Sequence, residues 1–299
     1  MPTIDKMRNA AIKLEMVPCR FGLFLAIPSD RCVGDAFIHY GEYSNAEVEL
    51  LQALLRPGMW AIDGGANIGA LTVPMAQAVT TAGKVIAIEP QPLLVPIVAA
   101  NVAINGVNGQ TVVIEAGLGK AKETMFVPAI DYAKPANYGG FRLDQFGSGY
   151  AVQVITLDGL DLPQCDFIKL DVEAMEVPAL QGAAETIKKF RPIMLVEADK
   201  PACGQETIKA VLDLNYDAYW FTNLLYAANN FYENPENIYD LQCSFNMLCV
   251  PKEKHDAICI EGLHRVRLGD PIGVAKQIDC ITTVKRKYNA SNIPVIACS

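Results

Sequence analysis

Two short segments of this chain place glycines and acids where a cofactor could bind. The first, residues 60–69, is an apolar strand that runs into the turn Asp63-Gly64-Gly65-Ala66-Asn67-Ile68-Gly69. The second, residues 84–90, is an apolar strand that ends in Glu89 and Pro90. Glycines in such a turn let the backbone approach a ligand, and an acid at the end of the next strand can accept hydrogen bonds from ribose hydroxyls. Together the two segments predict a pocket for an adenosine-bearing cofactor.

Three kinds of cofactor carry an adenosine, and the turn favours one of them. A P-loop nucleotide site is excluded because no Gly-Lys-Ser or Gly-Lys-Thr closes the turn. A dinucleotide site needs G-x-G-x-x-G, whereas this turn reads Gly65-x-Asn67-x-Gly69. The acids Asp63 and Glu89 suit a phosphate-free cation better than a diphosphate. We therefore expect S-adenosylmethionine, whose sulphonium is a cation, and keep a nicotinamide dinucleotide as the alternative.

The composition is typical of a soluble globular protein, since 51% of the 299 residues are hydrophobic and 19% are charged. The net charge is −8 and there is no long basic run, so nucleic acid is not an expected partner. No apolar run approaches the roughly 18 residues of a membrane helix, and the N-terminus lacks the apolar region of a signal peptide. Nine cysteines without a Cys-x-x-Cys motif indicate neither a disulfide framework nor a zinc site. A reducing, cytoplasmic setting is the expectation.

From residue 58 onward, strands and helices alternate, which predicts an α/β fold. Strands such as Phe167-Ile168-Lys169-Leu170 are mostly apolar and do not alternate, as in a parallel sheet covered by helices on both faces. Pro74 should kink the first helix or mark a later start. The expected strands are 58–63, 84–89, 111–115, 167–171 and 193–198, and the expected helices are 67–79, 93–104, 175–190 and 205–214.

Other segments flank or interrupt this alternation. We expect an N-terminal cap over residues 1–55, a main domain over 56–250 and a C-terminal extension over 251–299. The cap should hold short strands at 21–27 and 36–40, then a helix through Leu54 that begins with a capping box of Ser44 and Glu47. Extra strands are expected at 124–127 and 152–157, with a Gly/Tyr-rich lid or binding loop at 135–150 between them. We expect a hairpin-like pair of strands at the end of the sheet, formed by residues 219–221 and 246–250.

Taken in order, the motifs resemble the FkbM-type family of class I S-adenosylmethionine-dependent methyltransferases. The resemblance covers roughly residues 40–250. It rests on the glycine turn, Glu89-Pro90, Ile155-Thr156-Leu157-Asp158, Ile168-Lys169-Leu170-Asp171-Val172-Glu173 and Leu195-Val196-Glu197. It implies a Rossmann-like, mostly parallel seven-stranded sheet with one antiparallel strand near an edge. It also implies methylation of a hydroxyl, often on a sugar, a glycan or a polyketide-like natural product.

One residue departs from the family pattern, which usually has a glycine after Asp-x-Glu. Here that position is Ala174. An alanine would be strained there if the turn needs a positive φ angle.

The expected cofactor-binding residues lie at the ends of the strands and in the segment before the glycine turn. Asn67 and Ile68 should offer helix N-terminal amides to the cofactor's carboxylate, and Glu89 should accept the ribose hydroxyls. Glu42 and Tyr43 should close over its methionine end. The full set is Glu42, Tyr43, Asp63, Gly64, Gly65, Ala66, Asn67, Ile68, Gly69, Glu89, Pro90, Glu115, Ala116, Gly117 and Asp171.

The expected catalytic residues are Asp171, Glu173 and Glu197, any of which could take the proton of an attacking hydroxyl. The sequence does not rank Glu173 against Glu197. No metal site is predicted, although clustered acids could instead hold a Mg²⁺-like ion. Two other functions stay open: a nicotinamide-dependent oxidoreductase, and a non-catalytic relative that binds a glycan or a partner protein. Neither the methyl acceptor nor the oligomeric state follows from the sequence.

Overall fold

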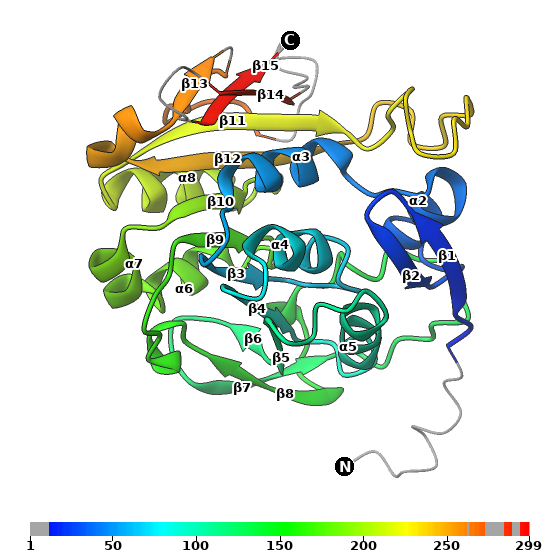
Figure 1. Cartoon of the computed structure of the whole chain (residues 1–299). Helices are drawn as coiled ribbons and strands as arrows, with labels where there is room; N and C mark the ends of the chain where they lie inside the picture. The colour runs from blue at the N-terminus through cyan, green and yellow to red at the C-terminus, as the bar shows by residue number, and fades with distance from the viewer. Residues whose placement is uncertain (1–11, 262, 273–283, 289–293, 299) are drawn as a thin grey trace.

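A seven-stranded sheet forms the centre of the molecule. The computed structural model describes residues 12–261, 263–272, 284–288 and 294–298. The strand order across the sheet is β11-β12-β10-β9-β3-β4-β5 (Figure 1). These strands are β3 (Trp60–Gly64), β4 (Lys84–Glu89), β5 (Thr111–Glu115), β9 (Phe167–Leu170), β10 (Ile193–Glu197), β11 (Tyr216–Leu224) and β12 (Cys243–Pro251).

The strands run parallel from β5 to β10, and β12 pairs antiparallel with both of its neighbours, β10 and β11. The predicted mostly parallel sheet, with one antiparallel strand near an edge, is confirmed. Successive residues of β4 enter different cores: Val85 and Ala87 join one hydrophobic cluster, and Ile86 and Ile88 join the other. Burial on both faces explains why these strands are apolar throughout.

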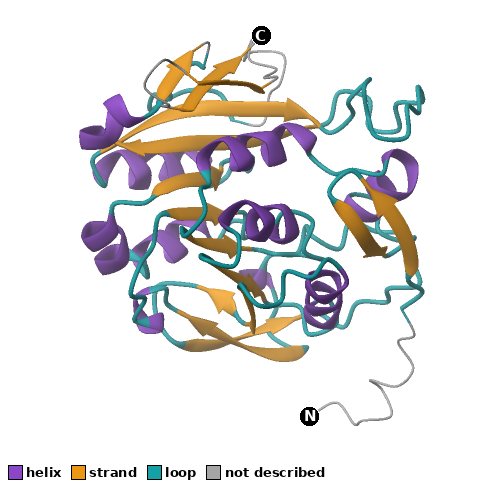
Figure 2. Ribbon diagram, viewed as in Figure 1, coloured by secondary structure: helices purple, strands orange, loops and turns teal. Residues whose placement is uncertain are grey.

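Helices cover both faces of the sheet (Figure 2), as predicted. The first cluster contains side chains from α3 (Asn45–Leu54), α4 (Thr72–Val79) and α5 (Val95–Ile104). The second contains side chains from α6 (Glu176–Gln181), α7 (Ala184–Phe190) and α8 (Gly204–Asp213). Short 3-10 helices are η1 (Leu143–Gln145), η2 (Asp158–Leu160) and η3 (Lys252–Ala257).

Two of the predicted helices, 93–104 and 205–214, lie within two residues of the observed bounds, and the other two differ more. The first begins at Thr72 and not at residue 67, so Pro74 lies in the first turn, where its missing N–H is not needed. The predicted helix 175–190 is two helices, α6 and α7. The Asp158 carboxylate accepts hydrogen bonds from the amides of Glu185 (3.1 Å) and Thr186 (2.7 Å), and this distant cap lets α7 begin anew.

The N-terminal segment holds one of its two predicted strands. Strand β2 (Gly22–Ala26) pairs antiparallel with β1 (Glu15–Cys19). The prediction of a strand at 36–40 is wrong, because these residues belong to helix α2 (Val33–Tyr40). Its buried side chains recur at helical spacing, and the Asp30 carboxylate accepts hydrogen bonds from amides at its start.

The predicted capping box of α3 does not form. Ser44 has a φ of 46° and makes no side-chain bond to the helix start. Its hydroxyl instead accepts a hydrogen bond from Asn223 (3.1 Å), and the Glu47 carboxylate accepts one from Asn246 (3.0 Å). Both partners come from the antiparallel pair β11 and β12, so tertiary contacts replace the local cap.

The extra strands between residues 118 and 166 are confirmed. Strands β6 (Gly117–Leu118), β7 (Glu123–Val127) and β8 (Tyr150–Ile155) form a separate sheet in the order β6-β8-β7. The loop between β7 and β8 is fixed to Gln91, whose side chain donates to the Tyr138 carbonyl (2.7 Å) and accepts from the Tyr132 hydroxyl (2.8 Å). The loop therefore lies against the segment that follows Glu89.

The C-terminal segment lies along the edge strand β11. The Trp220 amide donates to the His264 carbonyl (2.8 Å), and the Val266 amide donates to the Ala218 carbonyl (2.8 Å). Further strands, β13 (Cys259–Glu261), β14 (Val284–Tyr288) and β15 (Pro294–Cys298), form a small sheet beside it. The division at residues 55 and 250 stays a prediction.

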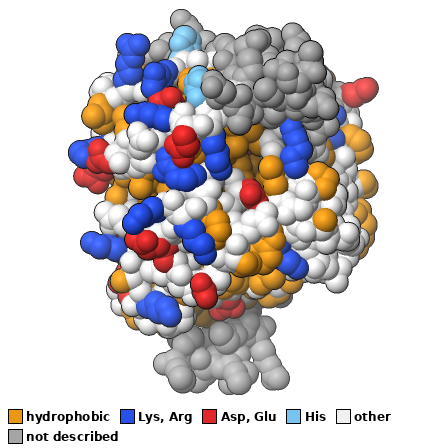
Figure 3. Space-filling view, turned by 60° about the vertical axis from the view of Figure 1, so that its left-hand side comes forward, with side chains coloured by type: hydrophobic (Ala, Val, Ile, Leu, Met, Phe, Trp, Pro, Cys, Tyr) orange, Lys and Arg blue, Asp and Glu red, His pale blue; other side chains and the backbone are white. Residues whose placement is uncertain are grey.

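The face shown in Figure 3 carries Lys and Arg side chains intermingled with Asp and Glu. Among the described residues, no helix is long and apolar enough to cross a membrane.

Candidate functional site

A cavity of about 450 Å³ lies at the carboxyl ends of β3, β4, β9 and β10. Small-molecule sites typically occupy roughly 300–1,000 Å³, and open α/β sheets place them at this edge. The cavity brings together many of the predicted residues, namely Tyr43, Gly65, Ala66, Asn67, Glu89, Pro90, Ala116, Gly117, Asp171, Glu173 and Glu197.

The glycine turn after β3 packs directly against the turn after β9. Gly65 has a φ of +79°, and a Cβ atom there would lie 1.8 Å from the Asp171 carbonyl oxygen. Only glycine fits this contact, which holds the two turns together under the cavity.

The expectation that Asn67 and Ile68 offer helix N-terminal amides is wrong, because α4 begins only at Thr72. The Asn67 amide instead donates to Glu89 (2.8 Å). Among the described residues, the buried Asn67 side-chain oxygen has no hydrogen-bond partner. Since Asn67 lines the cavity, this oxygen is free to accept a hydrogen bond from a ligand.

Glu89 ends β4 and is only 3% exposed. One carboxylate oxygen accepts from the Asn67 amide (2.8 Å) and the other from the Gln91 amide (2.9 Å). Burial raises the pKa of Glu89 to about 7, although these amides and Lys169 oppose the rise. The two amides fix the carboxylate at the cavity wall, and each oxygen keeps a lone pair for a further donor.

A buried lysine joins the two turns behind this wall. The Lys169 ammonium lies 3.2 Å from Asp63 and 3.6 Å from Asp171, and it donates to the Gly64 (3.3 Å) and Gly65 (2.9 Å) carbonyls. Burial would lower the pKa of Lys169, but Asp63 and Asp171 outweigh it and raise the pKa. Asp63 is fully buried, so its carboxylate pairs with Lys169 and does not line the cavity.

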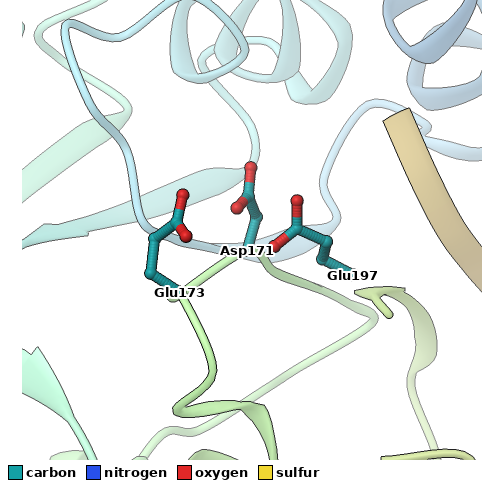
Figure 4. A group of neighbouring side chains, drawn as sticks. All are labelled: Asp171, Glu173 and Glu197. Carbon is teal, nitrogen blue, oxygen red and sulfur yellow. The ribbon is translucent and has the colours of Figure 1, made fainter. Parts of the chain in front are cut away.

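The three predicted catalytic acids converge on one space (Figure 4). One oxygen each of Asp171, Glu173 and Glu197 lie within 4.8 Å of one another. Such a trio attracts a cation, and the Lys200 ammonium lies there, 2.9 Å from Glu173 and 3.9 Å from Glu197. Lys200 also pairs with Asp199 (2.5 Å).

Burial and the neighbouring acids raise the pKa values of two members of this cluster. Burial and then Asp171 raise the pKa of Glu173 to about 7, against the pull of Lys200. Burial and Asp171 also raise the pKa of Glu197 well above its ordinary value.

The turn that presents Glu173 has a left-handed backbone. Glu173 has a φ of 54°, and Ala174 has a φ of 67°. The concern raised by Ala174 in the sequence is confirmed, since an alanine occupies a conformation that favours glycine.

The remaining predicted residues do not line the cavity. Gly64, Ile68 and Gly69 lie within the turn but outside the lining. Glu42 pairs with Arg20 (2.5 Å) and accepts a hydrogen bond from the Phe231 amide (3.0 Å). Glu115 is exposed on the edge strand β5.

Sequence reasoning missed Lys200, Gln91, Phe141 and Leu143, all of which line the cavity. Gln91 directly follows the Glu89-Pro90 motif, and this position is the one feature of the sequence that indicates that it lies at the site. Phe141 and Leu143 come from the loop expected to cover a ligand, although no pattern singled them out. Lys200 follows β10 by three residues and carries no motif.

Comparison with known families identifies the domain. The model of the methyltransferase FkbM domain matches residues 63–238, which include the glycine turn, Glu89 and the three acids. The chain belongs to the FkbM methyltransferase family. Membership shows an S-adenosylmethionine-dependent methyltransferase domain, as the motifs implied. No curated protein sequence gives a significant match.

Solved structures similar to this FkbM chain include three methyltransferases of low sequence identity. FkbM from Methylobacillus flagellatus KT is 15% identical with a TM-score of 0.45, and the match covers 67% of this chain and 50% of that protein. Precorrin-6y C5,15-methyltransferase from Geobacter metallireducens GS-15 is 13% identical (TM-score 0.47; 73% and 95% covered). An S-adenosylmethionine-dependent O-methyltransferase from Thermotoga maritima is 15% identical (TM-score 0.44; 79% and 77% covered). This chain thus spans half the length of the Methylobacillus protein.

Replacing Ala174 by glycine should stabilise the protein. A left-handed alanine costs roughly 1–2 kcal/mol, and the extra freedom of glycine in the unfolded chain returns about 0.4–1 kcal/mol of that. We expect Ala174→Gly to raise the free energy of unfolding by roughly 0.5–1 kcal/mol, measured by urea denaturation. Ala82→Gly, at an exposed position without a positive φ, should not stabilise and serves as the control. Equal or lower stability of Ala174→Gly would contradict the assignment of strain.

Three glutamates with raised pKa values should make stability depend on pH. Burial raises the pKa values of Glu89, Glu173 and Glu176 to about 7 from an ordinary value of 4.5. Between these pH values the folded protein holds protons that the unfolded chain has released, so the free energy of unfolding falls as pH rises.

The variant Glu176→Gln keeps an acceptor for the Val172 amide and should weaken this fall. Urea unfolding at intervals between about pH 5 and 8 measures the fall in the free energy of unfolding. Glu185→Gln is the control, because the Glu185 side chain is exposed. An identical fall in Glu176→Gln and the wild type would refute the assignment.

Proposed function

We propose that this FkbM chain transfers a methyl group from S-adenosylmethionine to a hydroxyl of a sugar, a glycan or a related natural product. The observation that carries the proposal is a single cavity that joins Glu89 and the glycine turn to the convergent acids Asp171, Glu173 and Glu197. One side suits an adenosine-bearing cofactor, and the other offers carboxylates to an acceptor.

The residues present fit the cofactor. Glu89 keeps lone pairs for the ribose hydroxyls, and the unpartnered Asn67 oxygen can accept a hydrogen bond from the cofactor's amino group. Ala116 and Gly117 line the cavity without polar side chains, and Phe141 and Leu143 add apolar surface for an adenine ring. Asp171 and its neighbours favour a positive charge nearby. When bound, the cofactor supplies an electrophilic methyl group on a sulphonium cation.

The chain's own residues then have two tasks. Holding the acceptor oxygen about 3–3.5 Å from the methyl carbon supplies up to roughly 7–11 kcal/mol. A carboxylate that takes the hydroxyl proton adds a factor of about 10²–10⁴ in rate. Positioning is therefore the larger contribution, and we assign the proton to Asp171, Glu173 or Glu197.

An uncharged hydroxyl acceptor suits the charges at the cavity. Its two lysines, Lys169 and Lys200, are both paired with carboxylates, so neither is available to an anionic acceptor. The methionine end of the cofactor would lie near Tyr43.

We also propose a cytoplasmic location and no nucleic-acid partner. Free thiols at Cys19, Cys32, Cys165, Cys203, Cys243 and Cys249 suit a reducing compartment. Nucleic-acid binding would require clustered basic side chains, whereas those in Figure 3 are mixed with acids.

Removing the Glu89 carboxylate should weaken cofactor binding. Hydrogen bonds to a charged group contribute about 1.5–3 kcal/mol, so Glu89→Ala should lower the affinity for S-adenosylhomocysteine roughly 10- to 150-fold. Calorimetric titration measures this affinity. Glu115→Ala is the matched control, because Glu115 pairs with Glu89 in register on β5 but is exposed. Unchanged affinity in Glu89→Ala would remove Glu89 from the cofactor site.

Replacing the three acids should separate turnover from cofactor binding. Asp171→Asn, Glu173→Gln and Glu197→Gln keep the side-chain shapes, and loss of the base should slow methyl transfer by about 10²–10⁴. Transfer is followed with labelled S-adenosylmethionine and an acceptor screen, and S-adenosylhomocysteine affinity is measured alongside. Wild-type rates in all three variants would exclude the carboxylates as bases.

Thermal unfolding with each cofactor, together with the acceptor screen, tests the other candidate functions. S-adenosylhomocysteine, and not NAD, should raise the melting temperature. Cofactor binding without transfer to any acceptor would favour the non-catalytic relative.

A further inference from the structure

Lys200 is fixed at the acceptor side of the cavity by its own backbone. Its carbonyl accepts hydrogen bonds from the amides of Cys203 (3.2 Å) and Gly204 (2.8 Å) at the start of α8. The segment before it is held by the Ala198 amide, which donates to the Phe245 carbonyl (2.8 Å). The side chain therefore extends toward the cavity from an anchored point.

The ammonium group contacts the acids unequally. Its nearest carboxylate is that of the adjacent Asp199, at 2.5 Å. Among the three convergent acids it lies 2.9 Å from Glu173 but 3.9 Å from Glu197, which belongs to the same strand end as Lys200 itself. Glu173 comes from the turn after β9, so this contact joins two turns that are separate in the sequence. Lys200 is 29% exposed and Glu173 is 16% exposed, so water screens the pair only in part.

We propose that Lys200 is a positioning residue for methyl transfer, which stabilises the ionised form of the Glu173 carboxylate at the cavity wall, where it can take the acceptor's proton. This inference rests on the proposed function. In the step it serves, Glu173 takes the proton of the acceptor hydroxyl, and the acceptor oxygen uses the freed electron pair to bond to the methyl carbon. The electron pair of the carbon–sulphur bond leaves with the sulphur.

The charges around Glu173 show why the lysine is needed. The titratable and charged groups that face it are Asp171 after β9, Glu176 on α6, Glu197, Asp199 and Lys200 after β10, and Cys32 before α2. Lys200 is the cation of this group. With it, the pKa of Glu173 is about 7, where a base works well at neutral pH. Without it, burial and the neighbouring Asp171 and Asp199 would raise the pKa of Glu173 further. Glu197 lies farther from Lys200, so Glu173 is the better base of the two.

The test follows the titration of Glu173 directly and needs no acceptor. Protein labelled with ¹³C at glutamate carboxyl carbons is titrated by NMR, and the Glu173 signal is identified by its loss in Glu173→Gln. In Lys200→Met the midpoint should rise by roughly 1–3 pH units, the effect of removing an opposite charge at this distance. In Lys200→Arg it should stay near the wild-type value. Lys209→Met is the control, because Lys209 pairs with Asp213 on the exposed side of α8.

An unmoved midpoint in Lys200→Met would overturn the proposal. If that variant does not fold, Lys200→Gln replaces it under the same criterion, and S-adenosylhomocysteine binding verifies the fold.

Activity then separates this inference from the proposed function. With an acceptor from the screen, the acid limb of the rate profile should move to higher pH in Lys200→Met and return in Lys200→Arg, with cofactor affinity unchanged. Methyl transfer with an unmoved limb would refute the role of Lys200 alone. Absence of transfer to any acceptor by the wild type would refute both proposals.

Discussion

The site depends on the ion pairs and hydrogen bonds of the buried Lys169 ammonium. A buried charge is costly unless it is paired and hydrogen-bonded, and this one has two carboxylates and two carbonyls as partners. Asp63 and Gly64 end β3 and Gly65 begins the turn after it, whereas Asp171 follows β9. The ion therefore fixes the glycine turn relative to the acids. The close contact of Gly65 with the Asp171 carbonyl adds a steric constraint to the same junction.

Around this junction, the acids that line the cavity differ in the groups that hold them. Glu89 is held by the backbone amides of Asn67 and Gln91. Glu173 is held by a lysine and lies among other carboxylates. Both have a raised pKa because burial disfavours the charged form, yet different groups oppose the rise. One fold thus places two similar side chains in environments suited to different tasks.

Much of the fold could be predicted because the central strands are buried on both faces. Strands β4 and β5 have the predicted bounds, since a short apolar run such as Val85 to Ile88 is typical of a strand that is buried on both faces. Errors occur where distant residues intervene. Asp158 starts α7 inside a predicted single helix, and Asn246 binds the carboxylate of Glu47 that a capping box would use. The error at α2 has a local cause instead, because the Asp30 carboxylate accepts hydrogen bonds from amides only two and four residues further along the chain.

For the site, the sequence by itself determined which residues end the parallel strands. It therefore also determined that Glu89, Asp171 and Glu197 lie at one edge of the sheet. This follows from local patterns, because apolar periodicity and glycine turns act over a few residues. The tertiary structure alone decided which of these side chains face the cavity and what they pair with. Glu42 contacts Arg20, and Lys200 reaches Glu173 across two turns. Such ion pairs depend on how distant segments pack, and no local spacing encodes that.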